Sequence, residues 1–226
     1  MKTFFRYINF FAFHAINWNP ILAVFVLYHT FRGEKKYGLN TFFPSELNKY
    51  GIEKGDISKA TRYEAVNYYI LENLLENFCK LFPQEKSLFD AGCGKGRVLV
   101  VAANYGFTHI TGVDFAKELC EEAERNIKII KTNFPNVVFK IVWNDILKTP
   151  LTADDKVFFL FNPFNKEILE KFVKNIEESL KEYPRPIYFI YASPKHADVL
   201  FGRNFKEVYR VKKMKFLEGI IVTKNN

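Results

Sequence analysis

The chain has 226 residues, enough for one substantial domain or for a domain with an extension. Its composition is 48% hydrophobic and its mean hydropathy is −0.13. These values support a packed core and exclude a protein with many membrane spans. The 33 lysines and arginines exceed the 25 acidic residues, which gives a formal net charge of +8. That balance suits an anionic partner or a solvated basic surface.

The amino-terminal region is aromatic and apolar. Residues 1–31 are predicted to be helical, with an interruption near Pro20. The apolar run at 21–28 is shorter than the roughly 20 residues that span a bilayer, and no signal-peptide cleavage site follows it. Two interpretations stay open. We prefer helices that pack on the domain or on a partner subunit. The alternative is a helix on a membrane surface, with Lys2 and Arg6 at its rim.

Glycines and prolines follow, so residues 32–60 are predicted to be a loop-rich connector. Apolar residues then recur at spacings of three and four over 61–80, which predicts one helix. We therefore divide the chain into a helical and loop-rich extension, 1–60, and a main domain, 61–226.

Strands and helices alternate through the main domain. This alternation predicts an α/β fold with a doubly wound, mostly parallel sheet, and the last two strands predict an antiparallel hairpin at its edge. The predicted strands are 87–91, 109–114, 136–142, 156–161, 187–192, 205–213 and 216–224, and the predicted helices are 97–104, 116–131, 165–181 and 195–201.

The three cysteines, Cys79, Cys93 and Cys120, are widely spaced and form no CxxC pair. Neither a zinc ribbon nor a disulfide framework is predicted, and we expect no metal. An odd number of free thiols fits a reducing compartment, so we expect a cytoplasmic protein.

A glycine-rich segment, DAGCGKGR at 90–97, follows the first predicted strand of the sheet. Glycines let the backbone approach a ligand closely, and such sheets bind ligands beyond the carboxyl ends of their strands. The dinucleotide pattern GxGxxG fails, because Arg97 stands at its last position. Asp90, placed before Gly92 and Gly94, would repel a pyrophosphate. It suits a cationic ligand such as S-adenosylmethionine, which carries an ammonium and a sulfonium and no phosphate.

Acidic and aromatic residues end the next two strands. Asp114 can accept hydrogen bonds from both ribose hydroxyls, or cap the following helix. Phe115 can lie against an adenine face or pack in the core. Asn144 and Asp145 can read the amino edge of adenine, or form an ordinary turn.

The fourth strand ends at 161–164, with the sequence Phe-Asn-Pro-Phe. Asn162 offers an amide near the sulfonium, Pro163 stiffens the turn and Phe164 offers a stacking wall. A strand-ending turn is the alternative. Tyr63 is a candidate lid residue, with ordinary helix packing as its alternative. Asn162 and Tyr63 are therefore the candidate catalytic residues.

Together these residues resemble the class I (Rossmann-like) S-adenosylmethionine-dependent methyltransferases, over about 61–226. Residues 89–96 match the first motif of that family, 113–114 its ribose-binding acid, 144–145 its adenine contact and 161–164 its substrate-side motif. The resemblance implies a seven-stranded sheet whose last strand is antiparallel. It also implies that Asp90 and Gly92 lie by the methionine moiety of S-adenosylmethionine, and Ala91 between them is a candidate cofactor-binding residue.

One motif departs from a known pattern. Enzymes that methylate base amines or glutamine carry N/D-P-P-Y/F, whereas this chain has a single proline at 162–164. The departure weakens the inference of an amine acceptor. No nucleic-acid recognition motif is present, so a protein side chain or a small molecule is favoured.

The predicted reaction is an SN2 methyl transfer, for which the enzyme must align the acceptor lone pair with the breaking C–S bond. His109 begins the second strand, so the motifs offer no evident histidine base. The alternatives are a non-catalytic module on the same fold, which binds S-adenosylmethionine or a membrane surface, and a nicotinamide oxidoreductase, which Asp90 disfavours.

Overall fold

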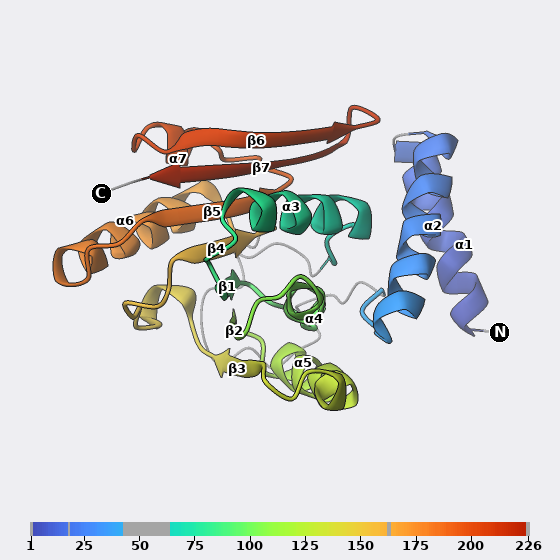
Figure 1. Cartoon of the computed structure of the whole chain (residues 1–226). Helices are drawn as coiled ribbons and strands as arrows, with labels where there is room; N and C mark the ends of the chain where they lie inside the picture. The colour runs from blue at the N-terminus through green and yellow to red at the C-terminus, as the bar shows by residue number, and fades with distance from the viewer. Residues whose placement is uncertain (1, 18, 43–63, 162–163, 225–226) are drawn as a thin grey trace.

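The computed structural model describes residues 2–17, 19–42, 64–161 and 164–224. Figure 1 shows a twisted sheet with helices on both faces and the first two helices, α1 and α2, beyond one end of it. The candidate residues Tyr63, Asn162 and Pro163 lie outside the described residues. The division of the chain at residue 60 also falls in an undescribed range and stays a prediction.

The described strands form one sheet with the order β3-β2-β1-β4-β5-β7-β6. Strands β1 to β5 are parallel, β7 is antiparallel to β5, and β6 is antiparallel to β7, which confirms the predicted fold. The strands are β1 (Ser87–Ala91), β2 (His109–Asp114), β3 (Val138–Trp143), β4 (Val157–Leu160), β5 (Ile187–Ala192), β6 (Lys206–Lys213) and β7 (Leu217–Lys224).

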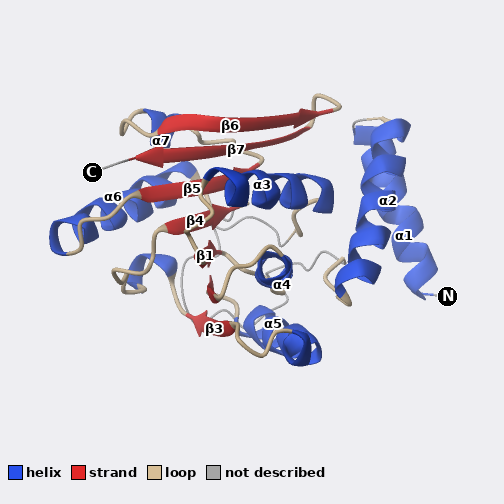
Figure 2. Ribbon diagram, in the orientation of Figure 1, coloured by secondary structure: helices blue, strands red, loops and turns tan. Residues whose placement is uncertain are grey.

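Helices cover both faces of the sheet (Figure 2). The central strands are buried on both sides, because their successive side chains point to opposite faces: Phe159 and Ile190 pack on one face, and Phe158 and Phe189 on the other. The first face is covered by α3 (Tyr68–Leu81), α4 (Arg97–Asn104) and α5 (Lys117–Ile130), and the second by α6 (Lys166–Glu182) and α7 (Asp198–Phe201).

The extension contains α1 (Lys2–Asn17) and α2 (Pro20–Tyr37). Helix α2 begins at a proline, which suits the first helical position, and the side chain of Asn19 accepts a hydrogen bond from the Leu22 amide at 2.7 Å. The helix ends at Gly38, whose φ of 66° is left-handed. Within the described ranges, every helix is too short or too polar to cross a membrane.

The prediction of a connector from residue 32 was wrong over its first six residues, because α2 continues to Tyr37. Gly33 does not mark a turn there. A β-carbon at Gly33 would lie 2.2 Å from Cγ of Tyr68, so the absent side chain makes room for that ring. Packing against α3 overrides the low helix propensity of glycine at this position.

The predicted helix over 61–80 also begins later than expected, at Tyr68. The side chain of Asn67 accepts a hydrogen bond from the Tyr69 amide at 2.9 Å and caps the helix. The Val66 carbonyl accepts from Nη1 of Arg97 at 2.6 Å. These two contacts hold residues 66–67 outside the helix.

Arg97 joins the extension to the sheet. Its guanidinium is 4% exposed, donates to Thr41 Oγ1 at 2.7 Å and to Glu34 Oε1 at 2.8 Å, and lies 4.2 Å from the centroid of the Tyr68 ring. Glu34 also accepts from the Tyr68 hydroxyl at 3.0 Å. Residues from α2, α3 and α4 therefore share one buried network.

We expect Gly33→Ala to destabilise the protein by about 1–3 kcal/mol, because the added methyl group overlaps the Tyr68 ring. Helix propensity alone predicts the opposite sign, a gain of up to about 1 kcal/mol. Urea unfolding of the variant and of the unmodified protein distinguishes the two. A gain in stability would contradict the packing of α2 on α3.

Candidate active site

The glycine-rich turn leaves β1 at the point where the strand order reverses, between β2 and β4. Gly92, Gly94 and Gly96 have φ values of 89°, 51° and 79°, which side-chain-bearing residues rarely adopt. The amides of Gly92 and Cys93 donate to the Val113 carbonyl at 2.8 and 3.0 Å. Gly92 is exposed, so the turn is anchored to β2 and presents open backbone to a ligand.

Asp114 ends β2 directly beside this turn. Its carboxylate accepts hydrogen bonds from the amides of Gly94 and Ala116, each at 2.9 Å. Burial raises its pKa to about 6, although those backbone bonds oppose the rise. A carboxylate has about four acceptor positions, so Asp114 can shape the turn and still accept from ribose hydroxyls. That ribose contact stays a prediction.

Asp90 is the penultimate residue of β1 and is 2% exposed. Its Oδ2 atom is buried and has no hydrogen-bond partner among the described residues. Burial, and after it the neighbouring Asp114, raise the pKa of this carboxyl well above its ordinary value. An unsatisfied buried acceptor costs about 1–3 kcal/mol, and a ligand carrying an N–H donor or a cation would satisfy it. The turn therefore fits the cationic cofactor that the sequence predicts.

The predicted adenine contacts lie at the ends of β2 and β3. Asp145 accepts from the Leu147 amide at 2.9 Å and caps the short 3-10 helix η4 (Ile146–Lys148), while the Asn144 amide donates to the Asp114 carbonyl at 3.0 Å. The Phe115 carbonyl accepts from Nε1 of Trp143 at 3.0 Å. The structure thus brings Phe115, Asn144 and Asp145 to neighbouring strand ends, and their adenine roles stay predictions.

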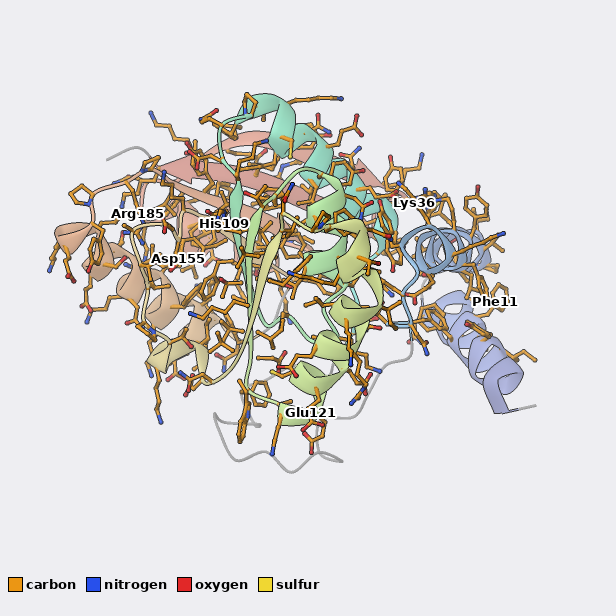
Figure 3. All side chains as sticks on the ribbon, turned by 60° about the horizontal axis from the view of Figure 1, so that its bottom comes forward. Phe11, Lys36, His109, Glu121, Asp155 and Arg185 are labelled. Atoms are coloured by element: carbon orange, nitrogen blue, oxygen red, sulfur yellow. The ribbon has the colours of Figure 1, made fainter. Side chains whose placement is uncertain are left out.

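Two further side chains lie near the predicted motifs. Phe164 is partly buried and its ring lies 6.1 Å from that of Phe172 of α6, so its role as a stacking wall stays a prediction. His109 is exposed at the amino end of β2, where the sequence predicts it. Figure 3 shows it on the side that carries Asp155 and Arg185, away from Phe11 and Lys36 of the first two helices.

A mostly apolar cavity of about 180 Å³ lies between the extension and the carboxyl ends of β4 and β5. Its volume is comparable to the roughly 150 Å³ of a cavity that holds one benzene ring. The residues that line this cavity could not be predicted from the sequence, because they come from segments far apart in the chain. The aromatic composition of the amino terminus was the one sequence feature that pointed to an apolar binding site there. The lining includes Phe10, Leu22, Val26, Phe42, Ile70, Phe161, Phe216 and Leu217.

A few polar groups also line this cavity. The Nδ2 donor of Asn67 is buried and has no partner within the described part of the chain. Ser193 follows β5 with a φ of 53°, and Glu64 and Glu218 supply carboxylates. An apolar cavity with a small number of polar groups is typical of a small-molecule or side-chain binding site.

Comparisons with known proteins agree with this geometry. Residues 88–183 match the family described as a methyltransferase domain. EEF1A lysine methyltransferase 2 of Danio rerio is 27% identical over 167 residues, which is 68% of this chain. The chain spans 65% of the length of that curated relative.

Solved structures share the fold at low sequence identity. An S-adenosylmethionine-dependent methyltransferase from Clostridium acetobutylicum is 10% identical with a TM-score of 0.54, covering 71% of this chain and 93% of its own. Magnesium protoporphyrin IX methyltransferase from Synechocystis, solved with bound S-adenosylmethionine, is 11% identical with a TM-score of 0.52, covering 70% and 81%.

The raised pKa of Asp114 predicts a pH effect on stability. The folded protein holds this proton more tightly than the unfolded chain, so the free energy of unfolding, taken relative to Asp114→Asn, should rise on acidification below about pH 6. From pH 7.5 to 5 the gain should be about 1.4 kcal/mol, one pKa unit. Urea unfolding at both pH values measures it, with the exposed Asp154→Asn as control. The same difference at both pH values would contradict the prediction.

Proposed function

Since the chain belongs to the class I S-adenosylmethionine-dependent methyltransferases, we propose that its methyl acceptor is a protein side chain, with a small molecule as the second candidate. The curated relative named a lysine methyltransferase supports a protein acceptor. The cavity has room for one ring or for a short methylene chain, which supports either candidate. The sequence carries no nucleic-acid recognition motif, so a nucleic acid is less favoured.

The glycine-rich turn would hold S-adenosylmethionine, which supplies an activated methyl group on its sulfonium. Asp90 offers its unpartnered carboxyl oxygen to the methionine end, and Asp114 keeps acceptor capacity for ribose hydroxyls. Gly92 and Gly94 keep side chains away from the ligand. Asn144, Asp145 and Phe115 are proposed on the adenine side, as the sequence predicts.

The observation that carries the proposal is that the turn and the cavity adjoin. Arg97 directly follows the last glycine and lines the cavity, and Phe161 lines it after leaving β4, the neighbour of β1. An acceptor in the cavity would therefore lie next to the methyl donor. Holding both reactants in one orientation can lower the barrier by roughly 7–11 kcal/mol in favourable systems.

Asn162 and Tyr63 stay proposed as catalytic residues, Asn162 also as a cofactor contact near the sulfonium and Tyr63 as a lid residue. The structure does not describe them, so the proposal rests on sequence alone. A cytoplasmic location is likewise a proposal, supported by the free thiols of Cys79, Cys93 and Cys120.

Gly92→Ala should weaken S-adenosylmethionine binding by about tenfold or more, because the new methyl group enters the space that the turn leaves open to the ligand. Gly106→Ala is the matched control: its φ of 88° equals that of Gly92 within one degree, and it lies between α4 and the amino end of β2, away from the carboxyl ends of the strands. Both variants should lose about 1–2 kcal/mol of stability. Isothermal titration calorimetry measures the affinity.

Equal affinity of the Gly92→Ala and Gly106→Ala variants would contradict the proposed cofactor site. Tight binding without methyl transfer to any protein or small molecule would instead support the non-catalytic alternative.

Phe216→Ala should raise the KM for the acceptor roughly fivefold, because a ring contact in the cavity is worth about 1 kcal/mol. Phe201→Ala is the control, since the two rings are similarly exposed (46% and 41%) and Phe201 lies on α7 outside the cavity. The assay follows radioactive methyl transfer from S-adenosylmethionine into fractionated lysate, with protein and small-molecule fractions counted separately. Equal rates for both variants would exclude a contact between Phe216 and the methyl acceptor.

A further inference from the structure

Helix α2 carries an apolar stripe on its outward side, consisting of Ile21, Val24, Tyr28 and Phe31. These side chains are between 49% and 72% exposed. Their spacing of three, four and three residues places them within an arc of roughly 80°, at about 100° per residue. The opposite side of α2 is buried and carries Leu22 and Val26 into the cavity. The helix is therefore apolar on two sides.

Exposed apolar residues gather on the first two helices. Ile8 and Ile16 of α1 are exposed as well as the α2 stripe, and Figure 1 shows the two helices side by side. In the rest of the described chain, exposed large apolar residues are scattered singly over different elements. A contiguous exposed apolar patch marks a surface that binds another body, whereas single residues need no explanation.

The same region is basic in sequence, although Arg32 and Lys36 pair with Glu72 of α3. Residues 1–42 contain five basic side chains, Lys2, Arg6, Arg32, Lys35 and Lys36, against the single acid Glu34. That acid is turned inward and pairs with Arg97. Lys35 is exposed and continues the α2 stripe, four residues after Phe31. The stripe therefore ends in a positive charge with no acidic residue beside it on its own helix.

The hairpin between β6 and β7 adds further positive charge beside α2. Nζ of Lys213 lies 5.9 Å from the centroid of the Phe25 ring of α2, which fixes the hairpin tip next to the helix, as Figure 1 also shows. Lys215 is exposed at the same tip, where Phe216 is 46% exposed, and the nearby Lys212 is exposed but pairs with Glu218. Basic groups thus flank the exposed apolar side chains.

We propose that the α2 stripe docks the protein on an anionic lipid surface. An interfacial helix buries an apolar face at the headgroup boundary and keeps basic residues at its rim, which is the arrangement of the stripe, Lys35 and the hairpin lysines. A second copy of the chain is the less suited occupant, because self-association would bring these positive charges together. The proposal concerns a surface outside the methyl-transfer site and does not depend on the acceptor.

The test uses the full chain and measures its co-sedimentation with vesicles of phosphatidylcholine, alone or with phosphatidylglycerol. The test variant is Ile21→Ser/Val24→Ser/Tyr28→Ser. All three side chains are exposed, so we expect the fold to be retained, and circular dichroism melting checks this. The matched control, Ile129→Ser/Val138→Ser/Phe201→Ser, removes three equally apolar exposed side chains from other elements. Lys35→Glu tests the charge.

We expect the unmodified protein and the control to bind the anionic vesicles. The stripe variant should bind them at least roughly tenfold more weakly. Lys35→Glu and added salt should both weaken binding. Equal binding of the stripe variant and the control overturns the proposal, as does equal binding to neutral and anionic vesicles. If the unmodified protein binds no vesicles but forms a dimer that the stripe variant does not form, the stripe contacts a second copy of the chain. That result also overturns the proposal.

Calorimetric titration with S-adenosylmethionine, on the same preparations without vesicles, separates this proposal from the proposed function. Cofactor affinity that is unchanged in the stripe variant, together with lost vesicle binding, supports the docking surface. Unmodified protein that binds the cofactor but no vesicle overturns the docking surface and leaves the methyltransferase site intact.

Discussion

The buried guanidinium of Arg97 is the group on which the arrangement of this molecule depends. Removing an arginine from water is costly unless every hydrogen bond is replaced with good geometry. Here the replacements come from Glu34, Thr41 and Val66, all outside the sheet. The extension is thus required to satisfy the charge of Arg97, which directly follows the glycine-rich turn and is buried. These hydrogen bonds fix the positions of the turn, the cavity and α2 relative to one another.

The two acids behind the turn follow a different physical logic. Asp90 and Asp114 are both buried, burial raises the pKa of both carboxyls, and Asp114 adds to the rise at Asp90. Among the described residues, Asp114 has both oxygens paired with backbone amides, whereas Oδ2 of Asp90 has no partner. Such a pair is poorly suited to a phosphate, and the unpartnered oxygen of Asp90 is what favours a ligand with positive charge.

Much of the fold could be predicted because local patterns determined it. Strands β1, β2 and β5 are short segments rich in apolar residues, and β5 is apolar throughout; their predicted bounds agree with the structure. Gly33 was misleading, because the reason for a glycine there is a ring 35 residues later in the chain, Tyr68. The cavity was out of reach for the same reason: no local pattern shows that α2, the end of β5 and a hairpin tip share one wall.

The rotation of α2 about its own axis is fixed near its end, by the contact of Gly33 with Tyr68 and by the ion pair of Glu34 with Arg97. Along the same helix, neighbouring residues such as Ile21 and Leu22 face opposite environments, one outward and one into the cavity. An insertion of a single residue between Val26 and Gly33 would rotate Leu22 and Val26 by about 100° relative to these contacts and remove them from the cavity. The outer surface and the cavity of this protein therefore have to change together, as two sides of one helix.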